Sequence, residues 1–131
     1  MQVCRITIAT TIDGNTTEIT RDGFCSLSLL SAKVCYEEDG AKVMLGLENG
    51  VVTINRIGDY TLSLTLIENK ICDGVLGING AEGAIQVKTN KLAYSLTETS
   101  LLLSLGYTLM ISGEPQEMKL RIFAKKQRKG E

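Results

Sequence analysis

In the stretch YTLSLTLI, residues 60–67, large apolar side chains alternate with small hydroxyl side chains up to Leu66. Tyr60 and three leucines fall on one side of an extended chain, and threonine and serine fall on the other. Because successive side chains of a β-strand point to opposite faces, this pattern predicts a strand with one buried face and one solvent-facing side. The same alternation recurs along most of the sequence, including Leu101 to Ile111.

Turns that contain glycine separate these alternating segments. Asn49-Gly50 is the strongest, since both residues tolerate the positive backbone angles of a two-residue hairpin. Asp22-Gly23 is predicted to interrupt a strand, and Asn90 to separate a strand over residues 84–89 from one over 91–97. No segment shows a helical period for more than a turn or two, so strands dominate the chain.

The predicted fold is all-β, a single antiparallel up-and-down β-barrel of about 8–10 strands, because so many strands hide their edges by closing. A Greek-key sandwich needs some long crossovers, and the connections here are short. Residues 1–125 are expected to form this one domain, and residues 126–131 a basic, disordered tail.

The composition excludes many kinds of enzyme. The 131 residues are 44% hydrophobic and 22% charged, which is ordinary for one globular domain, and none is histidine. The commonest general base and metal ligand is therefore missing, and the usual hydrolytic triads cannot be assembled. We predict no catalytic residues and no enzymatic activity.

The four cysteines, Cys4, Cys25, Cys35 and Cys72, form no C-x-x-C pair, and no histidine completes a zinc set. We therefore expect no metal and no cofactor.

The N-terminus has no small-residue cleavage site after its apolar run, so no export signal is expected. In the cytoplasm, the predicted location, the thiols would be small apolar core residues.

Charge is distributed unevenly around a net value of −1. Residues 119–131 hold six basic side chains and one acid, which are interpreted as a solvated chain end that keeps the last strand soluble. The longest uncharged stretch, Thr99 to Gly113, is too short and too polar for a membrane helix. Neither nucleic acid nor membrane is an expected partner. A small-molecule ligand and a second copy of the chain, as a homodimer, are left open.

Polar side chains on the apolar side of the strands mark a candidate ligand site. Arg56 shares parity with Val52 and Ile54, so its guanidinium is predicted to point inward, where a buried charge requires a partner. In one interpretation Arg56 holds an anion or carboxylate while tyrosine hydroxyls orient the ligand. In the other, Arg56 pairs with Asp59 at the strand end. The candidate ligand-binding residues are Arg56, Tyr60, Tyr94 and Tyr107, and Tyr36 has the same parity.

Several short segments resemble the YwiB-like family of small bacterial proteins of unknown function. Val52-Thr53-Ile54-Asn55-Arg56-Ile57-Gly58 is similar to a family strand that ends in Arg-x-Gly, and Asp22-Gly23-Phe24 to its acidic-Gly-aromatic corner. Val87 to Leu92 and Gly106 to Gly113 resemble its Thr-x-x-Leu and Tyr-x-Leu-x-x-x-Gly segments. The resemblance covers most of the chain and implies a lipocalin-like, or calycin-type, barrel with no established activity.

The chain departs from the family pattern in two places. Leu62-Ser63-Leu64-Thr65 stands where the family tends to have Gln-Met-x-Phe, and Gly77 to Gly83 replaces a usual Tyr-x-Thr-Pro-Tyr-Gly stretch. The sequence is consistent with two functions. The first is a barrel that binds a small, partly apolar or anionic ligand inside. The alternative is a protein-interaction or self-assembly module with a filled core and no ligand.

Overall fold

A computed structural model describes residues 1–127, and it folds them into ten consecutive β-strands joined by short turns. The strands are β1 (Gln2–Ile12), β2 (Asn15–Leu27), β3 (Ser31–Glu38), β4 (Ala41–Glu48), β5 (Val51–Ile57), β6 (Tyr60–Ile67), β7 (Ile71–Ile78), β8 (Ala81–Leu96), β9 (Ser100–Ile111) and β10 (Glu114–Lys126).

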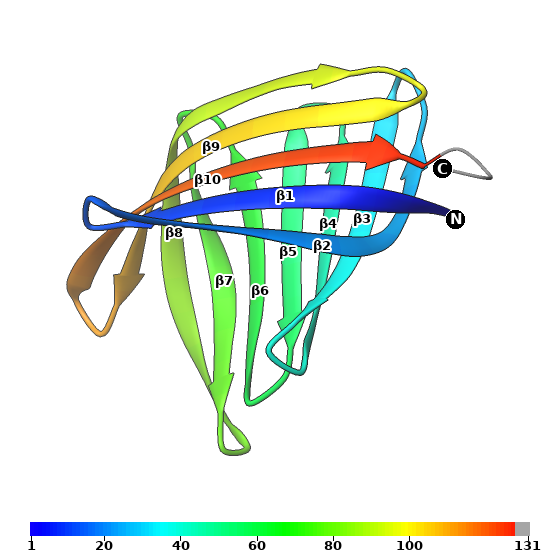
Figure 1. The fold of residues 1–131 in the computed structure, drawn as a ribbon. Coiled ribbons are helices and arrows are strands. Elements are labelled where there is room, and N and C mark those ends of the chain that lie inside the picture. Colours follow the sequence, from blue (N-terminus) through cyan, green and yellow to red (C-terminus); the bar gives the residue numbers. More distant parts are fainter. Residues whose placement is uncertain (128–131) are drawn as a thin grey trace.

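The strands form a closed, antiparallel up-and-down barrel (Figure 1). Every strand pairs with its neighbours in sequence, and β1 pairs with β10 to close the ring. The predicted fold class is therefore confirmed, with ten strands. Residues 1–127 form no α-helix, and they include no helix that is long and apolar enough to cross a membrane.

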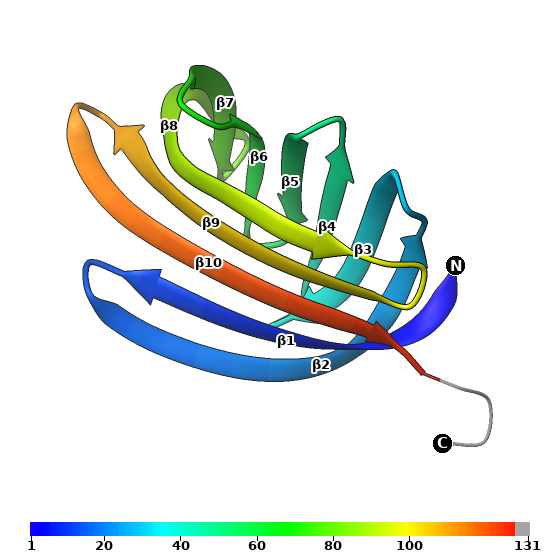
Figure 2. The same cartoon turned by 90° about the horizontal axis from the view of Figure 1, so that it is seen from above.

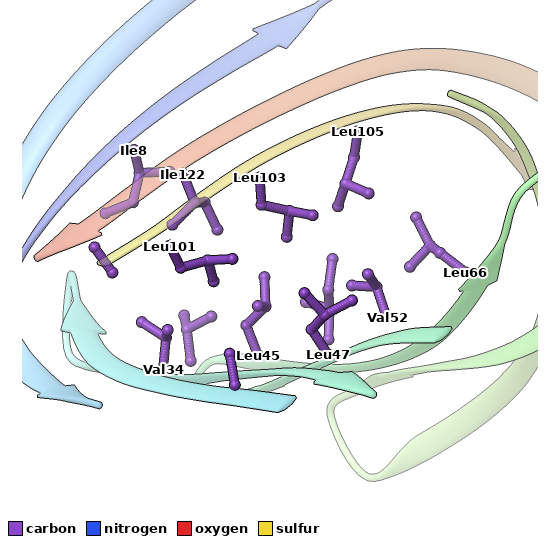
Figure 3. Close-up of a cluster of buried hydrophobic side chains, with 14 of the residues drawn as sticks. Ile8, Val34, Leu45, Leu47, Val52, Leu66, Leu101, Leu103, Leu105 and Ile122 are labelled. Atoms are coloured by element: carbon purple, nitrogen blue, oxygen red, sulfur yellow. The ribbon is translucent and has the colours of Figure 1, made fainter. Parts of the chain in front are cut away.

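The barrel is flattened into two walls. The long strands β8, β9, β10, β1 and β2 curve along one side, and the shorter strands β3 to β7 form the other (Figure 2). Inward side chains of the two walls meet between them: Ile8, Leu103 and Ile122 face Val34 and Leu45 across the interior (Figure 3). All five are at most 3% exposed.

The predicted break at Asp22-Gly23 is wrong, because β2 continues through both residues. Gly23 is needed for packing at this point. A Cβ atom there would lie 2.3 Å from the carbonyl oxygen of Cys35 on β3 and 2.7 Å from Cδ1 of Ile6. The glycine lets β2 pass close to β3 just where their pairing begins, at Phe24.

The predicted separation of two strands at Asn90 is also wrong. β8 runs without interruption from Ala81 to Leu96, and the register with β9 shifts between Thr89 and Lys91. Such a β-bulge adds one residue and bends the strand. Up to Lys88 the strand pairs with β7, whereas beyond the bulge it pairs only with β9.

The last strand reaches further than the sequence predicts. β10 includes Lys126, and the backbone N–H of Gln127 donates to the carbonyl of Val3 at 3.0 Å. The remainder of the predicted disordered tail, residues 128–131, lies outside the described residues. Lys119 and Arg121 belong to the barrel wall, where they alternate with inward-facing neighbours, so they are not part of a chain end.

Gly23→Ala should destabilise the protein by about 1–3 kcal/mol, because its Cβ has no room against Cys35. The matched control is Gly83→Ala, also within a strand, where no atom lies within 4 Å of the added Cβ. The control should leave stability unchanged or raise it by up to about 1 kcal/mol. Urea unfolding followed by circular dichroism measures both, and equal losses would contradict the close approach of β2 and β3.

Candidate functional site

Arg56 lies on the inner face of β5, between Val43 of β4 and Leu62 of β6. Its side chain is 14% exposed. The guanidinium Cζ lies 3.8 Å from the centroid of the Tyr60 ring, so the aromatic face holds the cation in place. The parity prediction for this residue therefore agrees with the register of the sheet.

One nitrogen of Arg56 makes both of its polar contacts. Nη1 donates to the backbone carbonyl of Tyr60 at 2.9 Å and lies 3.0 Å from Oδ1 of Asp59. The hydrogen bond from Arg56 holds the pKa of the Asp59 carboxyl below its ordinary value. The pairing with Asp59 is the alternative that the sequence left open. Asp59 itself is 79% exposed, so this ion pair lies at the surface end of the barrel.

The other two guanidinium nitrogens, Nε and Nη2, have no hydrogen-bond partner within residues 1–127. Thr89 Oγ1 is the side-chain atom of the described residues that is both fully buried and without a partner. Nε and Nη2 of Arg56 are therefore not fully buried and are in contact with solvent. Nε and Nη2 form one edge of the planar guanidinium, the arrangement that binds a carboxylate or phosphate in a bidentate manner. Arg56 thus presents an open pair of donors beside the ring of Tyr60.

Two further tyrosines approach this end from different strands. Tyr36 of β3 is 8% exposed and Tyr107 of β9 is 6% exposed. Burial, and after it the nearby phenol of Tyr60, raises the pKa of Tyr107 to about 12. Burial also raises the pKa of Tyr36, and Glu38 and Tyr107 add to this effect. These effects indicate that the three phenols lie near one another. Tyr36 and Arg56 both pair with Val43 of β4, so they lie in one row of the sheet.

Thr89 adds an unsatisfied polar group next to these phenols. It is opposite Tyr107 in the β8–β9 ladder, is 0% exposed, and its Oγ1 has no hydrogen-bond partner. A buried hydroxyl without a partner is unfavourable by about 1–3 kcal/mol, which a ligand or a water molecule would recover. We call Arg56, Tyr60, Tyr36, Tyr107 and Thr89 the barrel-end cluster.

Tyr94, the fourth residue predicted for the site, lies elsewhere. It is opposite Leu103 on the stretch of β8 beyond the bulge, four residues along β9 from Tyr107, and is 47% exposed. Tyr36 has the parity predicted for an inward side chain but was not among the residues predicted for the site, and Thr89 was not predicted at all. Thr89 also alternates in phase with Ile85 and Val87, which was the available signal.

The centre of the barrel is filled by apolar side chains. Leu45, Leu64, Leu101 and Leu103 are each at most 2% exposed and pack between the walls. Two prominent hollows of the described chain lie on the outside of the barrel, one over β8, β9, β10 and β1 and one over β3, β4 and β5. A ligand of the inner face would therefore occupy the barrel end and not its centre.

The cysteines take no part in the cluster. Cys4 and Cys25 are fully buried and Cys35 and Cys72 are half-buried, all as free thiols. Burial, with a smaller contribution from Cys25, raises the pKa of Cys4 to about 12, which makes its thiol unreactive. Residues 1–127 contain no group of three or more cysteine, aspartate or glutamate side chains that could hold a metal ion.

The fold and its polar end define the class of this protein: a small, closed antiparallel barrel of the calycin-like kind. Residues 3–122 match the family model described as "Domain of unknown function (DUF1934)", and the chain belongs to that family. It is similar to the crystal structure of ywiB protein from Bacillus subtilis, with a TM-score of 0.81 and 16% identity over 97% of this chain and 93% of that chain. Among curated proteins no match was found.

The buried phenol of Tyr107 predicts a loss of stability in alkali. Its ordinary pKa is 10.0, so the unfolded chain releases this proton from about pH 10, while the folded chain retains it until about pH 12. The free energy of unfolding should therefore fall across this range, by up to about 1.4 kcal/mol per pH unit for each such tyrosine. Below pH 10 the contribution of Tyr107 is fully present.

Urea unfolding at several pH values across this window measures the slope. Tyr107→Phe should make it shallower, because the variant has no proton to release. Tyr94→Phe is the control, since Tyr94 is 47% exposed, and it should keep the slope of the original protein. If both variants gave the original slope, the burial of the Tyr107 hydroxyl would be contradicted.

Proposed function

We propose that this protein binds a small, partly apolar anionic molecule at the barrel end, with Arg56 as the anion-binding residue. The observation that carries the proposal is the open edge of the guanidinium, where Nε and Nη2 have no partner within residues 1–127 and reach solvent. A carboxylate or phosphate on this edge would receive two parallel hydrogen bonds.

The neighbours of Arg56 fit an aromatic or apolar remainder of such a ligand. Tyr60 is 38% exposed and is already stacked on the guanidinium, so its outer ring edge is available for contact. Ile78, opposite Tyr60 in the β6–β7 ladder, is 51% exposed and adds apolar surface at the same end. The hydroxyls of Tyr36 and Tyr107 supply hydrogen-bonding groups between these surfaces.

The proposed activity is binding without catalysis. The cluster contains one cation and neutral hydroxyls, and burial raises the pKa of Tyr36 and of Tyr107, which makes these two phenols poor general bases near neutral pH. We propose the cytoplasm as the location, because free thiols persist in a reducing compartment. Tyr94 is not included in the proposed site, because it lies on the far stretch of β8.

Arg56→Gln should weaken the binding of an aromatic anion by about tenfold or more, because it removes a charged hydrogen-bonding group. The probe is 1-anilinonaphthalene-8-sulfonate, whose fluorescence rises on binding, together with amide chemical shifts that locate the bound probe. Arg5→Gln is the matched control: Arg5 is exposed on the outer wall and pairs with Asp22 at 3.5 Å.

The control should bind the probe as the original protein does. Equal binding by Arg56→Gln and the original protein would refute the proposal, as would shifts confined to residues remote from β5 and β6. Native mass spectrometry of protein purified gently from its own host adds a second readout. A retained small molecule that is absent from Arg56→Gln is the expected result.

A second candidate function, self-assembly, is favoured by an unpaired stretch of β8. Among the described residues 1–127, those beyond the bulge, 91–96, pair only with β9. Thr97 N–H donates to the carbonyl of Ser100, so in an antiparallel ladder the N–H groups of Leu92, Tyr94 and Leu96 point away from β9. That of Leu92 donates to the Glu68 carboxylate at 3.1 Å, so Tyr94 and Leu96 present the donors of the open edge. A second copy of the chain can add a strand to this edge and form a homodimer.

Tyr94→Pro tests the homodimer, because it removes one donor of the open edge and leaves the β8–β9 ladder intact. The original protein should be a dimer and Tyr94→Pro a monomer in size-exclusion chromatography with light scattering. Tyr94→Phe keeps the backbone donor and should remain dimeric. A monomeric original protein at every concentration would exclude this candidate and leave ligand binding unaffected.

A further inference from the structure

A groove of about 820 Å³ crosses the outer face of the long-stranded wall, on the opposite side of the sheet from the barrel-end cluster. Its floor is the outward face of β9, where Ser104, Gly106 and Thr108 follow one another at alternate positions. β8 and β10 flank this floor, and β1 continues the wall beyond β10 (Figure 1).

Gly106 lies between two lysines in the same row of the sheet. Lys91 of β8 is its partner on one side, and Lys119 of β10 is its partner on the other. Since neighbouring strands are about 4.8 Å apart, the two lysine backbones are separated by about 10 Å. Gly106 has no side chain, so an anion can approach the backbone between the two ammonium groups.

The next row of the sheet repeats the combination of a cation with a small polar residue. Arg121 of β10 is opposite Ser104 of β9 and Ala9 of β1. Its guanidinium therefore projects over small side chains, with the Ser104 hydroxyl as a further donor. Thr11, opposite Lys119 on β1, adds a hydroxyl at the other rim, 2.8 Å from that of Thr16.

The charge of the groove is opposite to that of the rest of the molecule. Lys91, Lys119 and Arg121 line it, and Glu117 is the one carboxylate among its lining residues. None of these three cations forms an ion pair within residues 1–127. Three unpaired cations over a floor of glycine and hydroxyls favour a ligand with more than one negative charge.

We propose that this groove binds a small molecule carrying a diphosphate group. One phosphate would lie over Gly106 between Lys91 and Lys119, and the other would lie toward Arg121 and Ser104. Hydroxyls and cations together satisfy phosphate oxygens, whereas a single carboxylate would leave part of the cation set unused. This site uses the outer face of β8, β9 and β10, whereas the proposed function uses the inner face at the barrel end. Tyr107 belongs to both linings, but its side chain is buried and only 6% exposed.

Titration of the ¹⁵N-labelled protein with inorganic pyrophosphate tests the proposal. Amide shifts should concentrate at Ser104, Gly106 and their neighbours on β8 and β10. Lys119→Glu should weaken the affinity by about tenfold or more, because it replaces an attraction by a repulsion. Gly106→Thr keeps every charge but fills the floor. Its Cβ would lie 3.4 Å from Cβ of Lys91, an ordinary contact, so this variant should fold and lose binding.

Lys33→Glu is the matched control, because Lys33 lies on the outer face of β3 in the opposite wall, beside Glu48. This variant and Arg56→Gln should both bind pyrophosphate within about twofold of the original protein. Melting curves of all variants establish that they fold.

Each of four results would overturn the proposal. The first is no saturable shift at about 1 mM pyrophosphate. The second is an equal loss of affinity in Lys33→Glu and Lys119→Glu, which would indicate a general effect of net charge. The third is equal affinity for inorganic phosphate and pyrophosphate. The fourth is tighter binding of single-stranded RNA through the same residues, which would make the occupant a nucleic acid.

Discussion

The structure depends on the antiparallel pairing of the first strand with the last. β1 and β10 match residue for residue from Cys4 opposite Lys126 to Ile12 opposite Met118. This ladder closes the ring, so the inward side chains of the long wall are forced against those of the short wall. The packed centre and the meeting of Tyr107 with Tyr36 and Tyr60 both follow from that closure, since these tyrosines come from opposite walls.

Local alternation was sufficient to predict most of the strands, their hairpin turns and the inward direction of Arg56, because each depends on side-chain parity within a few residues. It was not sufficient to predict which inward residues meet. Tyr94 and Tyr107 share the parity of their neighbours, yet the β8–β9 register places Tyr94 opposite Leu103, four residues along β9 from Tyr107. Gly23 likewise marked a break in the sequence pattern, while in the fold it permits contact with β3.

The basic residues near the C-terminus also show that a local sequence pattern does not predict which residues meet in the fold. Lys119 and Arg121 were interpreted as part of a solvated end, because six basic side chains gather in residues 119–131. Strand β10 instead holds them in the middle of a wall, next to β1 and β9. Lys91, far away in sequence, completes the set through the β8–β9 register. Pairing across strands, which no local pattern encodes, therefore created the cationic groove.

The stretch of β8 beyond the bulge has one distinctive contact at its start. The carboxylate of Glu68, on the turn after β6, accepts a hydrogen bond from the backbone N–H of Leu92 at 3.1 Å. An incoming strand that continued toward the bulge would have to displace this side chain and bury its charge. In the homodimer proposed above, Glu68 would therefore limit strand addition to the few residues beyond Leu92, which suits a finite assembly and opposes open-ended polymerisation.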